Sequence, residues 1–179
     1  MTMILPYRDI LPQIDPKAVV LASAVVVGDV HIGAGSTVWY NSVIRGDVNI
    51  VRIGCDTNIQ DGTVIHVAKH GQGSFIGDRV TIGHMALIHA CTIADDAFVG
   101  MKAAVLDGAR IEPFGMLAAG ALLTPNKVVP SHELWAGSPA RKMRDLTEAD
   151  YEVMRRTVPR YAKLGIEHKS AHISSSSWK

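Results

Sequence analysis

The chain of 179 residues has few aromatic residues, few cysteines and almost no net charge. Aromatic side chains make up only 6 % of it, so a core must be narrow and filled by aliphatic residues. A formal net charge of +1 provides no basic face, which argues against nucleic acid as a partner. No stretch reaches the roughly 18 consecutive apolar residues of a membrane span. The opening MTMILPYRDILPQID is too acidic and too interrupted by proline for a signal peptide.

Cysteine is limited to Cys55 and Cys91. Two thiols in a chain without a secretory signal favour a reduced, cytoplasmic setting. The two residues lack the spacing of metal ligands, and we expect both to be small buried residues.

The chain does contain a repeat of six residues. Aliphatic residues recur at about every sixth position, and a small residue usually follows four places later. This period fits neither a helix nor a simple alternating strand. It indicates a hexapeptide-repeat β-solenoid, whose short strands turn a corner every six residues. Side one of the triangular coil should hold Val20, Val38, Ile59, Ile82, Val99 and Leu117; side two Val26, Ile44, Ile65, Ile88, Val105 and Leu123; side three Ile32, Ile53, Ile76, Ile93 and Ile111.

The repeat and its breaks predict how the chain is organised. The coil needs extra residues within 45–52, an inserted loop at 67–75 and one residue fewer between Ile88 and Ile93, and such insertions often mark a binding face. Thr147 and Asp150 have the spacing of a capping box, and Pro159 should kink or interrupt the helix that follows. The expected segments are a lead-in (1–18), the coil (19–130), a connector (131–146), a helix (147–166) and a disordered tail (167–179).

Three of the eight histidines have a common setting beside these breaks. His66 and His89 each follow a buried isoleucine of side two, so they occupy the same slot on successive rungs about 4.8 Å apart. Arg45 occupies that slot one rung earlier. His84 belongs to side one and should face elsewhere. A single chain therefore offers two stacked ligands and a third that points away.

Threefold symmetry would bring these ligands together. If three chains pack about an axis, His84 of one can meet His66 and His89 of its neighbour. Three imidazoles at about 2.0–2.1 Å and one water describe a catalytic zinc site, in which the pKa of the water falls to about 7. Iron and cobalt accept the same ligands. The remaining histidines lack such neighbours: His31, His70, His132, His168 and His172.

Polar residues next to this cluster suggest supporting roles. Gln60 follows Ile59, in a place usually taken by a small residue, and its amide could orient the hydroxide. Arg45 and Asp47, in the motif IRGD, form either a salt bridge at a corner or a pair across an interface. Asp61 is either a turn residue or a partner across the same interface.

Taken together, these motifs resemble a known family. VIRGD, NIQDGTVIH, IGHMALIHACTI, VGM and WAGSPAR are similar to the γ-class carbonic anhydrases and their close bacterial relatives, over residues 20–165. The resemblance implies a homotrimer of left-handed β-helices that hydrates carbon dioxide to bicarbonate reversibly.

The resemblance also implies roles for individual residues. Zinc would be held by His66 and His89 of one chain and His84 of the next. Gln60 would lie beside the hydroxide, with Asn58 and Asp61 nearby, and Arg45 and Asp47 would pair between subunits. A tyrosine of the terminal helix approaches the site in some relatives, and Tyr161 is the matching residue here.

One departure and two alternatives remain open at this point. Well-studied members carry an acidic loop that exports protons, whereas VAKHGQGSF contains no carboxylate. Proton export then needs His70, water or buffer, and activity could be low or absent. A hexapeptide acyltransferase or thioesterase acting on coenzyme A thioesters would need only one histidine base, which leaves the spacing in GHMALIH unexplained. A catalytically weak metal-binding scaffold is the other alternative.

Overall fold

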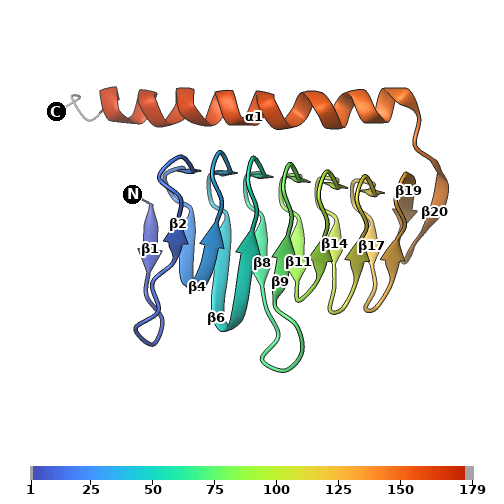
Figure 1. The fold of residues 1–179 in the computed structure, drawn as a ribbon, viewed down its shortest axis with the longest axis horizontal. Coiled ribbons are helices and arrows are strands. Elements are labelled where there is room, and N and C mark those ends of the chain that lie inside the picture. Colours follow the sequence, from blue (N-terminus) through green and yellow to red (C-terminus); the bar gives the residue numbers. More distant parts are fainter. Residues whose placement is uncertain (1, 176–179) are drawn as a thin grey trace.

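The chain folds into a parallel β-solenoid with one long helix along its length (Figure 1). The computed structural model describes residues 2–175. The solenoid has about seven turns and is a left-handed β-helix of hexapeptide repeats. Among the described residues, no helix is long and apolar enough to cross a membrane.

Three sides build the coil, as the six-residue period predicts. Side one consists of β3 (Val19–Val20), β5 (Thr37–Val38), β7 (Asn58–Ile59), β10 (Thr81–Ile82), β13 (Phe98–Val99), β16 (Met116–Leu117) and β19 (Glu133–Gly137). Side two consists of the first parts of β4 (Val25–Ile32) and β6 (Val43–Ile53), then β8 (Val64–His66), β11 (Leu87–His89), β14 (Ala104–Val105) and β17 (Leu122–Leu123). Side three consists of the last parts of β4 and β6, then β9 (Ser74–Ile76), β12 (Thr92–Ile93), β15 (Arg110–Ile111) and β18 (Val128–Val129).

The strand register confirms the three predicted columns of aliphatic residues. Ile59 pairs with Val38 and Ile82 on side one, and Ile65 pairs with Ile44 and Ile88 on side two. These side chains point into the coil and are fully buried. Burial of a side chain of this size contributes about 1.5–3 kcal/mol, so the aliphatic columns fix the register of each rung.

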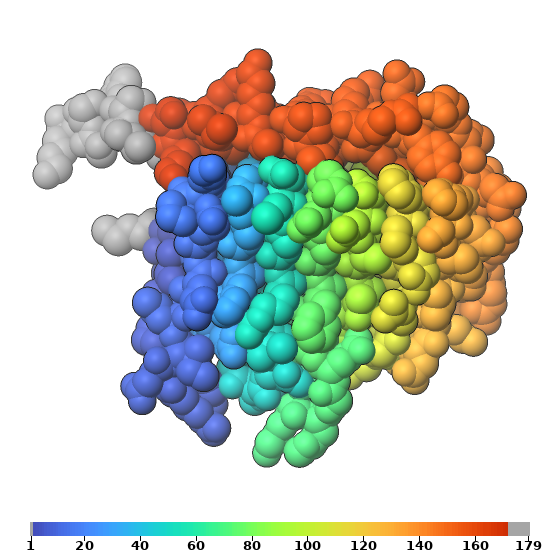
Figure 2. Space-filling model, viewed as in Figure 1, coloured from blue at the N-terminus to red at the C-terminus, as the bar shows by residue number. Residues whose placement is uncertain are grey.

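The predicted breaks in the repeat appear as local changes of the coil. Strands β4 and β6 continue through a corner, and their register shifts between Gly28 and Val30. The inserted loop, residues 67–73, projects from the coil between β8 and β9 (Figure 1 and Figure 2). Both breaks lie next to strands of side two, which carries His66 and His89.

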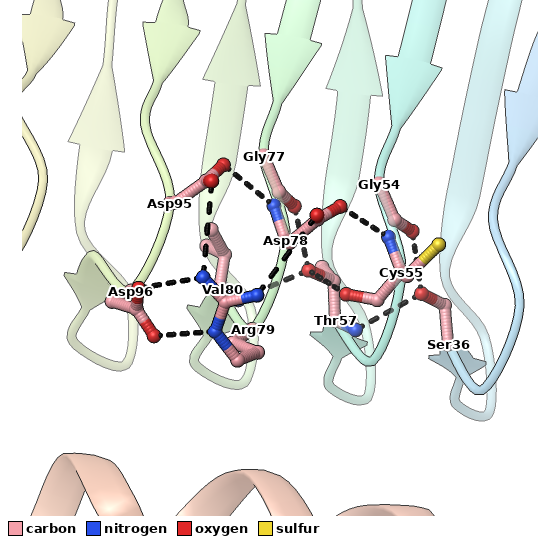
Figure 3. Close-up of polar contacts among 10 residues, drawn as sticks. All are labelled: Ser36, Gly54, Cys55, Thr57, Gly77, Asp78, Arg79, Val80, Asp95 and Asp96. Atoms are coloured by element: carbon pink, nitrogen blue, oxygen red, sulfur yellow. Dashed lines mark hydrogen bonds and ion pairs between the residues drawn. The ribbon is translucent and has the colours of Figure 1, made fainter.

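Aspartate side chains join successive rungs at the corner between sides three and one (Figure 3). The Asp78 carboxylate accepts a hydrogen bond from the Cys55 N–H at 2.7 Å, and Asp95 accepts one from the Asp78 N–H at 2.9 Å. Arg79 donates two bonds of 2.8 Å to Asp96. The bonds to Asp78 and Asp95 satisfy backbone N–H groups that the turns leave without a partner in the sheet, and the Arg79–Asp96 pair joins the side chains of two successive rungs.

Helix α1 (Glu148–Ser175) packs along side one. Figure 2 shows it lying over the rungs from one end of the coil to the other. Gly165 allows this approach, because a Cβ there would lie 2.8 Å from the Thr37 methyl group. Pro159 does not interrupt the helix, contrary to one of the two expected outcomes.

The helix is longer than the sequence suggests. It continues through residues 167–175, where the sequence predicts a disordered tail, and residues 176–179 lie outside the described range. Its extension is supported by His168, whose Nδ1 lies 2.9 Å from the Tyr40 hydroxyl and whose ring packs edge-on against Trp39. A histidine to which the pattern assigns no role therefore ties the last turns to the coil.

Both ends of the coil have more regular structure than expected. The lead-in contains β1 (Met3–Leu5) and β2 (Gln13–Ile14), and both pair with β4. The connector contains β19, which extends side one, and β20 (Ala140–Asp145), which pairs with β19 antiparallel. Single strands at the ends lack a second repeat with which to show the period, so the pattern does not reveal them.

The start of α1 supports a prediction about stability. Asp150 accepts hydrogen bonds from the Thr147 N–H and hydroxyl, both at 2.7 Å, as the capping-box spacing indicates, and it also pairs with Arg144. Arg144 and then Thr147 lower the pKa of Asp150. Asp150→Asn should lower the free energy of unfolding at pH 7 by about 1 kcal/mol. Because the lowered pKa stabilises the fold only while the carboxylate is charged, the difference should shrink below about pH 4. Urea unfolding at pH 7 and pH 3 checks this; a difference equal at both pH values would contradict it.

Candidate metal centre

His66 and His89 lie side by side on side two. The two residues are paired in register on β8 and β11, as the repeat predicts. Their ring centroids are 5.2 Å apart, and His66 Nδ1 lies 3.3 Å from His89 Nε2. Both side chains are partly exposed, so the space between them can be reached from outside.

A carboxylate holds the other nitrogen of each ring. His66 Nε2 lies 3.0 Å from Asp47 Oδ1, and His89 Nδ1 lies 2.6 Å from Asp107 Oδ1. Because a carboxylate only accepts, these nitrogens carry the protons, and in neutral rings the two nitrogens that face each other both have free lone pairs. Two such lone pairs repel each other unless a proton or a metal ion lies between them.

The spacing of these nitrogens fits a metal ion. Two imidazole nitrogens bound tetrahedrally at about 2.0–2.1 Å lie roughly 3.3 Å apart, which is the separation in this structure. The carboxylate behind each ring is the usual outer contact of a histidine ligand. The donor set therefore fits zinc or a similar divalent cation.

Asp107 is missed by the sequence reasoning. It comes two residues after the buried Val105, one rung beyond His89, and its carboxylate reaches back to that histidine. The sequence signal is an acidic residue next to the histidine slot on the following rung.

His84 lies on another side of the coil from His66 and His89, as expected. It follows β10 on side one, where its Nδ1 lies 2.8 Å from Asp61 Oδ2 and its Nε2 lies 3.1 Å from the Tyr161 hydroxyl. Asp61 fixes the proton on Nδ1, so Tyr161 donates to Nε2. Within residues 2–175 of this single chain, no three His, Cys, Asp or Glu side chains are placed to hold a metal together.

Tyr161 comes from α1, and its hydroxyl contacts His84, one of the predicted ligands. Its ring packs edge-on against Trp39 with centroids 5.1 Å apart. Burial, and secondarily the charge of Asp61, raise the pKa of Tyr161. The hydroxyl therefore stays protonated at neutral pH and remains a donor to His84.

Gln60 is buried, and neighbouring polar groups fix its orientation. Its amide nitrogen donates to Asn58 Oδ1 at 2.9 Å, and the Asn58 amide donates to Thr81 Oγ1 at 2.9 Å. The residue is 4 % exposed and, together with Tyr161, lines a cavity under α1. Its carboxamide oxygen accepts no hydrogen bond within the described part of the chain and is the group available to a ligand.

Arg45 and Asp47 pair with each other within the chain. Asp47 also accepts a hydrogen bond from His66, so it connects the arginine to the candidate ligand. Burial opposes ionisation of Asp47, but hydrogen bonds from His66 and Arg45 outweigh it and lower the pKa of Asp47. The pair between subunits that the resemblance implies stays a prediction.

The cysteines take no part in this cluster. Cys91 is buried, as expected, and burial raises the pKa of its thiol to about 12. Cys55 is exposed, so the expectation that it is buried is wrong; it lies at the aspartate corner of Figure 3, where its side chain faces outward.

Comparisons with known proteins agree with the fold. A solved hexapeptide transferase family protein from Anaplasma phagocytophilum superposes with a TM-score of 0.89 and 42 % identity, covering 93 % of this chain and 98 % of that one. The fold thus defines a hexapeptide-repeat protein. No protein-family model matches the chain.

Two sequence relatives narrow the class. A probable carbonic anhydrase of Methanocaldococcus jannaschii is 48 % identical over 141 residues, which cover 79 % of this chain and 88 % of that protein. Gamma carbonic anhydrase 1, mitochondrial, of Arabidopsis thaliana is 47 % identical over 165 residues, which cover 89 % of this chain. The matched region spans only 60 % of the Arabidopsis protein. The chain belongs to the γ-carbonic anhydrase family.

Proposed function

We propose that this protein is a metal-dependent carbonic anhydrase, which hydrates carbon dioxide to bicarbonate reversibly as a homotrimer. His66 and His89 of one chain and His84 of the next would hold zinc, with iron or cobalt as alternatives. The observation that best supports this is the pair of carboxylate-held imidazoles whose free nitrogens face each other at 3.3 Å. The names of the curated relatives support the reaction.

The outer surface of side two supports the trimer. Beside the two histidines runs a column of outward apolar residues: Val43, Val64, Leu87, Ala104 and Leu122. Val64 is 39 % exposed and Leu87 is 40 % exposed in the single chain. Side one is covered by α1. The outward column of side three is mainly polar and consists of His31, Arg52, Phe75, Thr92, Arg110 and Val128. An apolar column next to incomplete metal ligands is what a second copy of the chain would cover.

The residues around the ligands have separable roles in this proposal. Bound zinc would supply the Lewis acid that brings the pKa of a water to about 7. Gln60, fixed by Asn58, offers its carboxamide oxygen to the hydroxyl of water or bicarbonate. Arg45 supplies a positive charge for the bicarbonate product, and Asp47 holds both Arg45 and the His66 ring. Proton export through His70, water or buffer, without an acidic loop, stays a prediction, as do low activity and a cytoplasmic location; the Arabidopsis relative is named as mitochondrial.

An acyltransferase or thioesterase is the alternative, supported by the name of the solved transferase family protein. The experiment that separates the two is metal analysis of anaerobically purified protein, followed by stopped-flow hydration of carbon dioxide. We expect close to one metal ion per chain and hydration that depends on it. Active acyl transfer by metal-free protein would overturn the proposal. A metal-loaded protein that does not hydrate carbon dioxide in strong buffer would favour the alternative of a catalytically weak metal-binding scaffold.

Tyr161 leads to a prediction about metal affinity. Its hydroxyl occupies His84 Nε2, the nitrogen that a metal must use, because Asp61 holds the other one. A net hydrogen bond contributes about 0.5–1.5 kcal/mol, so Tyr161→Phe should tighten zinc binding by roughly two- to tenfold. Competition with a chromogenic chelator measures it. Tyr151→Phe is the matched control, because Tyr151 makes the corresponding bond to His132 at 2.9 Å. Weaker zinc binding in Tyr161→Phe would mean that the hydroxyl supports the bound metal instead.

A further inference from the structure

A cavity of about 410 Å³ lies between side one and α1. Phe98, Met116 and Leu134 form its floor as outward residues of successive rungs in register. Val153, Thr157 and Tyr161 form its roof, spaced four residues apart on one face of the helix. No acidic or basic side chain lines it.

Polar groups of this cavity include Gln60 and Tyr161. Gln60 is more than nine-tenths buried, and its carboxamide oxygen accepts no hydrogen bond from the described residues. No side-chain oxygen or nitrogen that is wholly shielded from solvent lacks a partner within residues 2–175, so this oxygen opens on the cavity. Tyr161 adds a hydroxyl, and because it also contacts His84 the cavity reaches the proposed metal ligand.

The cavity exceeds the needs of the proposed reaction. Carbon dioxide has three heavy atoms, whereas pockets of about 300–1,000 Å³ hold much larger organic ligands. Packing of the helix does not explain an apolar space of this size. A role for the Gln60 oxygen beside the hydroxide would still leave the apolar part of the cavity, along Phe98, Met116 and the helix, without an occupant.

We propose that this cavity binds a neutral, mainly aliphatic molecule with a single amide or hydroxyl group. The chain of the ligand would lie between Phe98, Met116 and the helix. Its N–H or O–H would donate to the carboxamide oxygen of Gln60 or to the oxygen of Tyr161, whose own proton is donated to His84. An ionised ligand is excluded, because nothing in the lining compensates a buried charge. The proposal does not depend on carbonic anhydrase activity, since binding is measured directly.

Linear primary amides from acetamide to octanamide are suitable probes. Each buried methylene contributes about 0.8 kcal/mol, so affinity should rise roughly fourfold per added carbon until the cavity is full. Hexanoate, the charged counterpart of hexanamide, should bind at least about tenfold more weakly. Methyl-labelled methionine reports the location by NMR, because Met101 and Met116 line the cavity, while Met3 is exposed and lies on β1 at the other end of the coil.

A filling variant tests the location. Ala118 lines the cavity and follows Leu117 on side one, whereas Ala94 follows Ile93 on side three, outside it. Ala118→Leu should abolish the octanamide shifts at Met101 and Met116, and Ala94→Leu should keep them. Circular dichroism and metal content identify any variant that fails to fold. If a variant does not fold, the dependence of affinity on amide chain length in the wild-type protein tests the proposal instead. Absence of shifts in wild type, shifts at Met3 only, or affinity independent of chain length would each overturn the proposal.

Discussion

His84→Ala is expected to remove the metal from the protein, although this histidine makes no contact with the other two candidate ligands within its own chain. In the proposed trimer it completes the site that His66 and His89 of the neighbour begin. Loss of a contact behind a ligand weakens metal binding by about 10–100-fold, and loss of a ligand itself should exceed that. Metal analysis after dialysis against a weak chelator measures the effect. The fold should persist, because the coil is held by its buried aliphatic columns.

His132→Ala is the matched control for this result. His132 also joins the coil to a tyrosine of α1, at 2.9 Å from the Tyr151 hydroxyl, and it is far from the ligands in sequence. The His132→Ala protein should keep its metal, although it loses a comparable contact between the coil and the helix. Full metal occupancy in His84→Ala would show that the shared site is wrong.

Mixed trimers test sharing directly. Chains with His84→Ala still provide His66 and His89, and chains with His66→Ala still provide His84. By symmetry, each mixed trimer has one of its three interfaces at which the two intact halves meet. Because about a quarter of randomly assembled trimers are unmixed and have no intact site, equal co-expression should restore about a quarter of the metal. A site built within one chain would not recover.

The fold could be predicted from sequence because its repeat is short and its core is aliphatic. A one-residue slip would turn a residue such as Ile65 outward, so the six-residue period determines the register as well as the architecture. The residue that follows a buried isoleucine on one rung must lie above its equivalent on the next. The repeat alone therefore predicts that His66 lies beside His89, and the strand register confirms it.

What could not be predicted depends on contacts outside the repeat. The reach of Asp107 back to His89 crosses from one rung to the next and has no period of its own. The last turns of α1 depend on His168 packing against Trp39 and Tyr40, a contact between segments more than a hundred residues apart. The cavity under the helix depends on how closely α1 approaches side one, which the pattern of the helix alone does not give.

Leu87→Asp is expected to separate the subunits and thereby release the metal. Leu87 lies in the apolar column of side two, 40 % exposed in the single chain, and burying a carboxylate there without a partner would cost several kcal/mol. Light scattering should show a smaller particle, and metal content should fall with it. The new charge lies two residues before His89 and would by itself attract a cation, so loss of metal would report loss of the neighbour rather than a direct effect on the ligands.

Val128→Asp is the matched control for the interface. Val128 is 39 % exposed, is also an outward strand residue, and lies on side three instead of side two. The same substitution there should leave both particle size and metal content unchanged. If Leu87→Asp stays trimeric and loaded, side two is not the interface. If both variants dissociate, side three also belongs to the interface, and the proposed packing of side two against the His84 corner of the neighbour is wrong.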